Sequence, residues 1–217
     1  MESVDINWIT FLQPYKLAVD NFVLKLGTIK RQYTTYGLKN PIEDITGRVK
    51  TPNSILEKLK RMKMDISEIK ELNDIAGIRI TCKYIQDVYK IYDILKSRKD
   101  IKIKEIKDYI KNPKQSGYRS LHVIAYYNAE TINGQERIII EFQIRTLAMH
   151  LWACIEHSLK YKYYRSIPES LKVRLQNASK IANELDIEME KLKKEMDDLP
   201  DDEERIEVDY KEWHNTI

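Results

Sequence analysis

The stretch Arg137–Arg145, with the sequence RIIIEFQIR, combines an apolar row with a row of groups that can do chemistry. Alternate side chains of an extended strand point to opposite faces of a sheet. The polar face carries a carboxylate, an amide and a guanidinium, from Glu141, Gln143 and Arg145. The apolar face carries Ile140, Phe142 and Ile144. Such a strand can hold a polar ligand, but an antiparallel strand with one face in water has the same pattern.

A second carboxylate stands just before another predicted strand, Ala76–Cys82, with the sequence AGIRITC. Asp74 precedes this strand, and within it Arg79 points away from the core. An acidic residue at the edge of a strand, followed by an outward arginine, could hold a metal ion and a nucleotide. The same pair also fits an aspartate in a turn and a solvated arginine.

A helix is predicted to begin near Pro52, with Ser54 on its first turn. Three cations cluster around this start: Arg48, Lys50 and Lys58. Because the N-terminus of a helix carries partial positive charge and free N–H groups, added cations make it a natural anion site. A plain basic turn at the surface is the alternative interpretation.

The loop KDYIKNPKQSGYRS, residues 107–120, places basic side chains beside an aromatic one. Tyr118 lies at its tip, among Lys107, Lys111, Lys114 and Arg119. Basic residues with an aromatic ring suit contact with phosphate and stacking on a base. This loop is therefore a second candidate for binding a nucleotide.

Hydrophobic periodicity predicts the elements that must position these groups. Helices are predicted over Trp8–Tyr33, Ile66–Leu72, Tyr84–Arg98 and Leu147–Tyr161, and from Pro168 onward. Further strands are predicted over Ile101–Ile106 and Ser120–Asn128, and the second of these carries His122. A turn at Asn133–Gly134 joins that strand to the one that follows, as in a hairpin.

Two of the predicted helices have long apolar seams. From Leu171 to Leu199 apolar residues recur every three or four positions for four heptads, which is typical of a helix that packs on another helix. The first helix repeats this spacing from Trp8 to Tyr33. The seams favour self-association through helices, and packing within one subunit is the alternative.

The composition indicates a globular protein with an uneven charge. The 217 residues are 42% hydrophobic and 33% charged, with a net charge of +3. Residues 197–209 hold eight acids and one arginine, a net of −7, so the rest of the chain carries +10. A basic body suggests phosphorylated ligands or nucleic acid, although lysine-rich solubility has the same appearance. We expect one domain over residues 1–199 and a mobile acidic tail over residues 200–217.

The N-terminus lacks a basic start and an apolar core, and no apolar run approaches the length of a membrane helix. These features predict a cytoplasmic protein without a membrane partner.

Cys82 and Cys154 lie in apolar segments and are expected to be reduced, buried thiols. His150, Cys154 and His157 share one helix face, where packing or hydrogen bonding is favoured over a metal site because HExxH spacing is missing.

Four blocks in order resemble the synthetase domain of the RelA/SpoT family: GRVKTPNSILEK, DIAGIRI, KDYIKNPKQSGYRSLHV and EFQIRTLAMHLWACIEHSLKYKY. The short chain is similar to the RelQ-type small alarmone synthetases, and we expect it to have no room for the hydrolase domain of the long relatives. The resemblance implies transfer of pyrophosphate from ATP to the 3′-hydroxyl of GDP or GTP, which gives AMP and ppGpp or pppGpp.

The resemblance also implies a role for each candidate residue. Asp74 and Glu141 would bind Mg²⁺, and Glu141 would also draw the proton from the attacking hydroxyl. Arg48 and Arg79 would sandwich the adenine. Two further sets complete the implied site: ATP phosphates on Lys50, Ser54 and Lys58, and a GDP or GTP pocket of Lys114, Tyr118, His122, Gln143 and Arg145. Tyr118 would stack on the guanine.

The implied fold is of the α/β (α+β) class, with a mixed, roughly five-stranded sheet flanked by helices and related to nucleotidyltransferases. RelQ-type enzymes are homotetramers held by their terminal helices, so the resemblance implies a homo-oligomer. Single-stranded RNA is a further candidate partner for the basic body. Where pppGpp-activated RelQ-type enzymes carry an aromatic residue and a lysine, this chain has Asp44 and Gly27, which predicts weak or absent activation.

Two other functions stay open from the residues. The same site could pyrophosphorylate another 3′-hydroxyl, on an adenosine nucleotide or a tRNA end, since the Tyr118 loop favours guanosine only modestly. A non-catalytic nucleotide- or RNA-binding regulator would need a broken catalytic pair, and both Asp74 and Glu141 are present. GDP, GTP and GMP all stay open as the acceptor.

Overall fold

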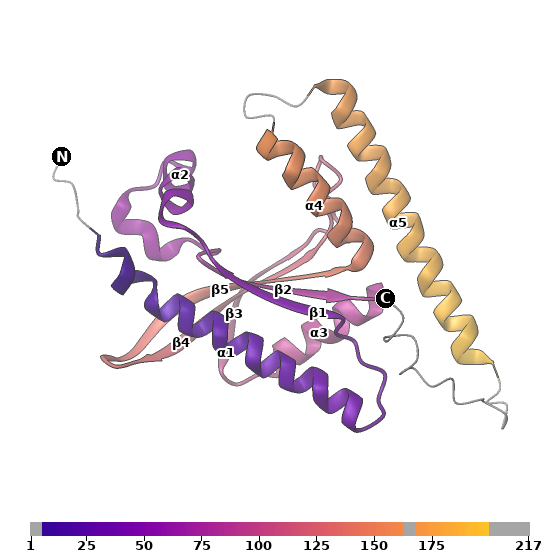
Figure 1. Cartoon of the computed structure of the whole chain (residues 1–217), viewed down its shortest axis with the longest axis horizontal. Coiled ribbons are helices and arrows are strands. Elements are labelled where there is room, and N and C mark those ends of the chain that lie inside the picture. The colour runs from indigo at the N-terminus through magenta and orange to yellow at the C-terminus, as the bar shows by residue number, and fades with distance from the viewer. Residues whose placement is uncertain (1–5, 163–167, 200–217) are drawn as a thin grey trace, which may run out of the picture.

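The computed structural model of the chain describes residues 6–162 and 168–199 (Figure 1). Its helices are α1 (Trp8–Thr35), α2 (Pro52–Met62), the 3-10 helix η1 (Ile66–Glu71), α3 (Ile85–Ser97), α4 (Leu147–Lys162) and α5 (Glu169–Asp198). Its strands are β1 (Asp44–Val49), β2 (Ala76–Cys82), β3 (Ile101–Asp108), β4 (Leu121–Thr131) and β5 (Gly134–Thr146). The predicted acidic tail lies outside the described residues.

The strands form one mixed sheet in the order β1-β2-β5-β4-β3. β2 and β5 are parallel, while the other neighbouring strands are antiparallel. The predicted five-stranded α+β architecture is therefore confirmed. The residues alone had indicated four of the five strands. β1 was not among them because, apart from Ile45 and Val49, its side chains are exposed and it has no buried row to recognise.

One face of the sheet is covered by α1 and α3, while α2 and α4 rise from the other face (Figure 1). The predicted alternation of β5 is confirmed, since Ile140, Phe142 and Ile144 are all buried. Phe142 meets Phe22 of α1 edge to face, with 5.0 Å between ring centroids. Burial of one apolar row thus fixes which way the polar row of the same strand points.

The seam of α1 is buried within the subunit. Tyr15, Phe22 and Leu26 are buried in the core, and Pro14 lies inside the helix. For α1, therefore, the alternative interpretation of the seam, packing within one subunit, describes the structure. The physical reason is that the helix covers the apolar face of the sheet, where burying large side chains is most favourable.

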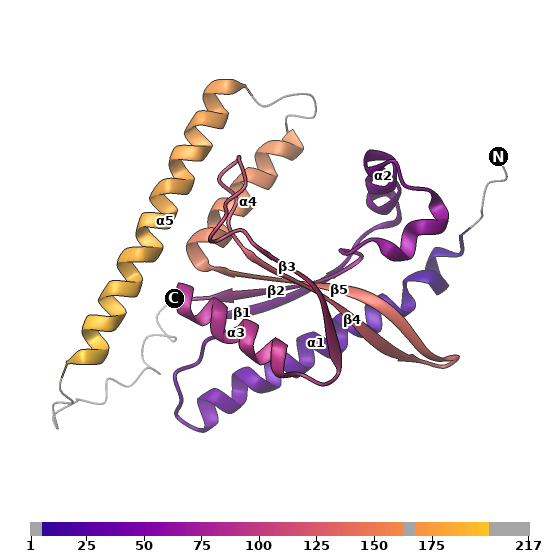
Figure 2. The ribbon, with the colours of Figure 1, turned by 180° about the vertical axis from the view of Figure 1, so that it is seen from behind.

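Helix α5 lies outside α4, on the side away from α2 (Figures 1 and 2). Its buried residues are mainly polar: Leu175, Ser179, Asp186 and Lys193. Much of its apolar seam is exposed, with Leu185 50% and Met196 65% accessible. The helix thus turns a polar row toward its own subunit and leaves an apolar row outside.

The two cysteines differ in their surroundings. Cys82 is buried as predicted, and burial raises the pKa of its thiol. The prediction of a buried Cys154 is wrong, because this residue of α4 is exposed in an open cavity. Within the described ranges, no helix combines the length and the apolar character that crossing a membrane requires.

Candidate active site

Strand register brings the predicted polar residues into rows across the open face of the sheet. Arg79 of β2 lies opposite Gln143 of β5, which lies opposite His122 of β4. Two residues earlier on β2 and β5, Gly77 lies opposite Glu141. Because β2 and β5 are parallel neighbours, side chains more than 60 residues apart in the sequence share one face of the sheet.

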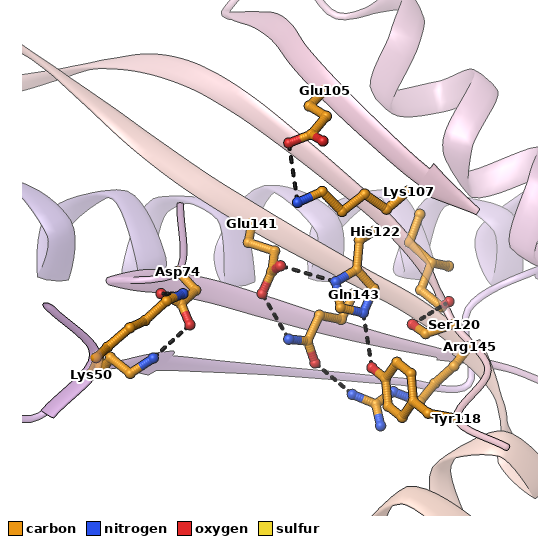
Figure 3. Close-up of polar contacts among 12 residues, drawn as sticks. Lys50, Asp74, Glu105, Lys107, Tyr118, Ser120, His122, Glu141, Gln143 and Arg145 are labelled. Atoms are coloured by element: carbon orange, nitrogen blue, oxygen red, sulfur yellow. Dashed lines mark hydrogen bonds and ion pairs between the residues drawn. The ribbon is translucent and has the colours of Figure 1, made fainter. Parts of the chain in front are cut away.

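A chain of hydrogen bonds runs through the middle of this face (Figure 3). Glu141 Oε1 lies 2.9 Å from His122 Nδ1, and His122 Nε2 lies 2.8 Å from the hydroxyl of Tyr118. Gln143 donates to Glu141 Oε2 at 2.8 Å and accepts from Arg145 at 2.6 Å. Glu141 therefore holds one nitrogen of the His122 ring, and the other ring nitrogen faces the hydroxyl of Tyr118.

Glu141 is buried but remains acidic. Burial raises the pKa of its carboxyl, yet the hydrogen bond and charge of His122 and the hydrogen bond of Gln143 outweigh burial and leave the pKa below its usual value. The charge of Asp74 works in the opposite direction. In the structure the carboxylate is ionised at neutral pH and can accept a proton.

Asp74 sits between two lysines. Lys50 Nζ lies 2.5 Å from Oδ2 of Asp74, and Lys58 Nζ lies 2.6 Å from Oδ1. Burial raises the pKa of Asp74, but the hydrogen bonds and charges of the two lysines outweigh burial and hold the pKa below its usual value. The two cations predicted to hold phosphate are therefore paired with the acidic residue predicted to hold a metal.

Helix α2 begins beside this cluster, as predicted. Thr51 caps it by accepting a hydrogen bond from the backbone N–H of Ser54 at 3.4 Å, and its hydroxyl donates to Ser54 Oγ at 3.0 Å. Proline at the first helical position costs no hydrogen bond there. The capped start of α2 thus lies next to Lys50 and near Lys58, which suits an anion.

Two adjoining cavities open on this face. The first, of about 240 Å³, is lined by Asp74 and Glu141 and also by Thr46, Gly47, Arg48, Gly77, Ile78, Arg79 and Gln143. The second, of about 410 Å³, is lined by Tyr118 and Arg145 and also by Arg48, Arg79, Gln143, Ala153, Cys154, Glu156 and His157. They share Arg48, Arg79 and Gln143, so the two carboxylates lie in a cavity that continues into the one beside Tyr118.

Two guanidinium groups face these cavities with incomplete hydrogen bonding. Nε of Arg79 and Nε of Arg145 are buried and have no acceptor among residues 6–162 and 168–199. Arg145 is only 3% exposed, and burial lowers the pKa of its guanidinium. A buried donor without a partner is costly unless something fills its place. An anionic or carbonyl-rich ligand in the cavities would supply those acceptors.

The loop between β3 and β4 carries Tyr118, which lines the second cavity, and Lys114, which lies beside the Tyr118 ring. Lys114 Nζ lies 4.9 Å from the ring centroid of Tyr118. Burial raises the pKa of the Tyr118 hydroxyl, which therefore stays protonated at neutral pH. Lys107 and Lys111 instead pair with Glu105 and Asp108, respectively, and Arg119 donates to the carbonyl of Ile110.

Helix α4 adds four cavity residues that the sequence reasoning had not placed in the site. Ala153, Cys154, Glu156 and His157 line the second cavity, and Cys154 Sγ lies 3.6 Å from His150 Nε2. For Cys154 and His157, a shared face on a helix that directly follows β5 was the only indication available. Among the residues that the structure describes, no three His, Cys, Asp or Glu side chains group as a metal site.

Comparison with known proteins decides the family. A family model described as "Region found in RelA / SpoT proteins" matches residues 47–166, which include all twelve candidate site residues. The chain belongs to the RelA/SpoT family. This RelA/SpoT protein is 45% identical over 192 residues to the GTP pyrophosphokinase YjbM of Bacillus subtilis, covering 88% of this chain and 91% of that relative. The predicted resemblance is confirmed.

Solved structures of small alarmone synthetases resemble this RelA/SpoT protein closely. Small alarmone synthetase 1 from Bacillus subtilis bound to its product pppGpp superposes with a TM-score of 0.85, at 45% identity, over 88% of this chain and 98% of that one. The same protein bound to AMPCPP gives a TM-score of 0.80, at 40% identity, over 90% and 100%.

Proposed function

We propose that this chain is a GTP pyrophosphokinase that transfers the pyrophosphoryl group of ATP to the 3′-hydroxyl of GDP or GTP. The products are AMP and ppGpp or pppGpp. The relatives named GTP pyrophosphokinase support this activity over most of the chain. From the structure, the observation that carries the proposal is the pair Asp74 and Glu141 in a cavity that continues into the one beside Tyr118.

The donor side of the site is the region of β1, α2 and the start of β2. Lys50, Lys58 and the N-terminus of α2 with Ser54 would bind the ATP phosphates, while Arg48 and Arg79 would stack on the adenine. Because a transferred pyrophosphoryl group carries several negative charges, fixed cations stabilise it more than covalent help would. A relative's complex with AMPCPP, an analogue of ATP, supports a donor site of this kind.

The acceptor side is the region of the loop before β4 and the end of β5. Tyr118 would stack on the guanine, and Lys114, His122, Gln143 and Arg145 would contact the rest of the nucleotide. The unfilled Nε donor of Arg145 supports this assignment, because phosphate or base oxygens would complete its hydrogen bonding. A relative's complex with pppGpp supports a guanosine nucleotide here.

The carboxylates fit a divalent cation. Asp74 and Glu141 offer oxygen donors in one cavity, and Mg²⁺ in nucleotide enzymes is typically held by one or two carboxylates together with substrate phosphates. When bound, Mg²⁺ would neutralise charge on the phosphate oxygens. The lysines that now pair with Asp74 would then be free to turn to those oxygens.

Glu141 would act as the general base. The acceptor 3′-oxygen forms a bond to the β-phosphorus of ATP, the bond from that phosphorus to the oxygen bridging the α-phosphorus breaks, and AMP leaves. The proton of the 3′-hydroxyl passes to the carboxylate of Glu141. His122 and Gln143 hold that carboxylate from two sides, so it is oriented before the acceptor arrives.

The test is an incubation with Mg²⁺, ATP labelled in the β- and γ-phosphates, and one acceptor at a time. The acceptors are GDP, GTP, GMP, an adenosine nucleotide and tRNA. We expect label on the 3′-oxygen of GDP or GTP, with one AMP formed for each transfer. Transfer only to adenosine or tRNA would favour the alternative 3′-hydroxyls, and no transfer to any acceptor would favour a binding protein.

We also propose a homo-oligomer, with a tetramer as the predicted state, assembled through α5. Its apolar residues Leu185, Met189, Leu192 and Met196 are exposed in the isolated subunit. Burying such a heptad seam against another helix is favourable. Light scattering on the purified chain would measure the assembly, and a monomer at micromolar concentration would contradict the proposal. Cytoplasmic location and single-stranded RNA as a regulator remain predictions.

A further inference from the structure

Helix α5 holds the backbone of the loop that carries Tyr118. Ser179 Oγ donates to the carbonyl oxygen of Gly117 at 2.5 Å, and Gln176 Nε2 donates to the carbonyl oxygen of Gln115 at 2.9 Å. These partners are 62 and 61 residues apart in the sequence. Both contacts end on main-chain oxygens, so they act on the backbone of the loop directly.

The loop is a tight turn built to meet the helix. Lys114 accepts from the N–H of Gly117 at 2.8 Å and donates its own N–H to the carbonyl of Tyr118 at 3.1 Å. Gly117 has φ +93°, and a Cβ there would stand 2.6 Å from Cβ of Ser179. Only glycine allows both this backbone conformation and this close approach of the helix.

Ser179 is directed to the loop by its neighbours. A serine within a helix often bonds to the carbonyl four residues earlier. Here that carbonyl, of Leu175, accepts from Trp152 Nε1 of α4 at 2.8 Å. The indole of Trp152 also packs near the Tyr118 ring, with centroids 6.4 Å apart. Helix α4, helix α5 and the loop are thus joined through Trp152 and Ser179 into one connected unit.

A third contact extends the same helix face. Asp186 accepts from Thr146 Oγ1 at 2.7 Å and is close enough to Arg119 for their charges to interact. Gln176, Ser179 and Asp186 therefore follow the loop from Gln115 to Arg119 along one side of α5. Among the described residues, Lys50, Lys58 and Asp74 at the donor side bond to one another, and no hydrogen bond or ion pair joins them to α5.

We infer that Ser179, assisted by Gln176, is a positioning residue for the acceptor nucleotide. By fixing the turn around Gly117, these side chains hold the Tyr118 ring at the second cavity, where the acceptor base would stack. The inference deepens the proposed function and rests on it. Helix α5 lies beyond residues 47–166, the part of the chain that the family model matches.

The inference predicts a selective loss. In Ser179→Ala the loop loses one hydrogen bond, and the KM for GDP or GTP should rise about 3- to 10-fold. The KM for ATP should stay within about twofold, since the donor residues are untouched. Gln176→Ala should raise the acceptor KM about 2- to 3-fold, because Gln176 is exposed and its bond competes with water.

Steady-state kinetics with each substrate varied in turn would measure both KM values. Ser170→Ala and Asn177→Ala, at exposed positions of the same helix, are the matched controls and should change neither. An equal rise of both KM values, or no change in either, would overturn the positioning role. If Ser179→Ala fails to fold, Gln176→Ala decides alone. A wild-type chain inactive on GDP and GTP would instead refute the proposed function.

Discussion

The two ends of the site are built in opposite ways. At the donor end, Lys50 and Asp74 are 24 residues apart and bound directly to each other, with Lys58 on the same carboxylate. At the acceptor end, Tyr118 is placed by a hydrogen bond with His122 and by a helix about 60 residues further along the chain. The charges at the donor end are balanced by residues close in the sequence, whereas the acceptor loop is held in position by a helix far along the chain. Substitutions at the two ends should therefore have different kinetic effects.

The largest effect is expected where the two ends meet, at Glu141. Glu141→Gln keeps the shape and the hydrogen bond from His122 but removes the base, so kcat should fall about 10²- to 10⁴-fold. Acceptor binding and any RNA binding should persist. Turnover assays, with Glu130→Gln on the exposed hairpin as control, would check this. A variant as fast as wild type would show that Glu141 is not the base.

The next largest effect should be selective, with a substitution at each end raising the KM for a different substrate. Tyr118→Ala should raise the KM for the guanosine nucleotide by about 5- to 100-fold, because stacking on a base is worth about 1–3 kcal/mol. Lys58→Ala should instead raise the KM for ATP by about tenfold, because one cation that would hold its phosphates is lost. Each KM would be measured at saturating concentration of the other substrate.

The difference between the two ends would be contradicted if Tyr118→Ala and Lys58→Ala changed the same KM. Lys60→Ala, an exposed lysine on the same helix as Lys58, serves as the control for general loss of charge and should leave both KM values unchanged. If Tyr118→Ala affected ATP as strongly as GDP, the two cavities would act as one site and the division into donor and acceptor sides would fail.

A smaller effect concerns stability near the acceptor loop. Burial raises the pKa of Asp186 to about 6, despite the hydrogen bond from Thr146 and the charge of Arg119, and Glu190 adds to the rise. A raised pKa in the folded state means that wild type loses stability as pH rises from about 4 through 6. Asp186→Asn should escape this loss and be about 1–2 kcal/mol more stable at pH 8, after discounting for solvent screening.

Urea unfolding at pH 4.5 and pH 8 would measure that difference. The two proteins should differ little at the lower pH and clearly at the higher one. If the variant were less stable at pH 8, the ionised carboxylate would be making a favourable pair with Arg119, and the contact between α5 and the loop would be electrostatic.

The smallest expected effect is on activation by pppGpp. Asp44 is exposed at the start of β1, and its charge would repel a phosphorylated effector, while Gly27 offers no cation on α1. Addition of pppGpp to the synthesis reaction should therefore leave the rate within about twofold. Clear stimulation would mean that other residues form an effector site, and Asp44→Phe would then test whether the acid weakens it.

Local pattern was enough to predict the sheet interior. The bounds of β2 and the buried row of β5 follow from a period of two, because each residue's side is fixed by its neighbours in the chain. The pattern failed where burial did not follow polarity. Strand β1 has mostly exposed residues, so alternation could not reveal it.

The prediction of α5 shows the other limit. Its heptad seam was visible in the sequence, but the face that packs in the subunit carries Ser179, Asp186 and Lys193. These residues are buried because they meet polar partners, such as the Gly117 carbonyl and Thr146. Polar contacts between residues so far apart produce no periodic pattern in the sequence. The contact between α5 and the acceptor loop therefore became visible only in the structure.

Helix α5 must keep its residue count as well as its residue types. Each residue advances an α-helix by about 100°, so one amino acid inserted between Ser179 and Leu185 would turn the following half by that angle. The carboxylate of Asp186 would swing away from Thr146, and the row from Leu185 to Met196 would face a new direction. A substitution on this helix would change one contact, whereas a deletion or insertion there would disturb the inner contacts and the outer surface together.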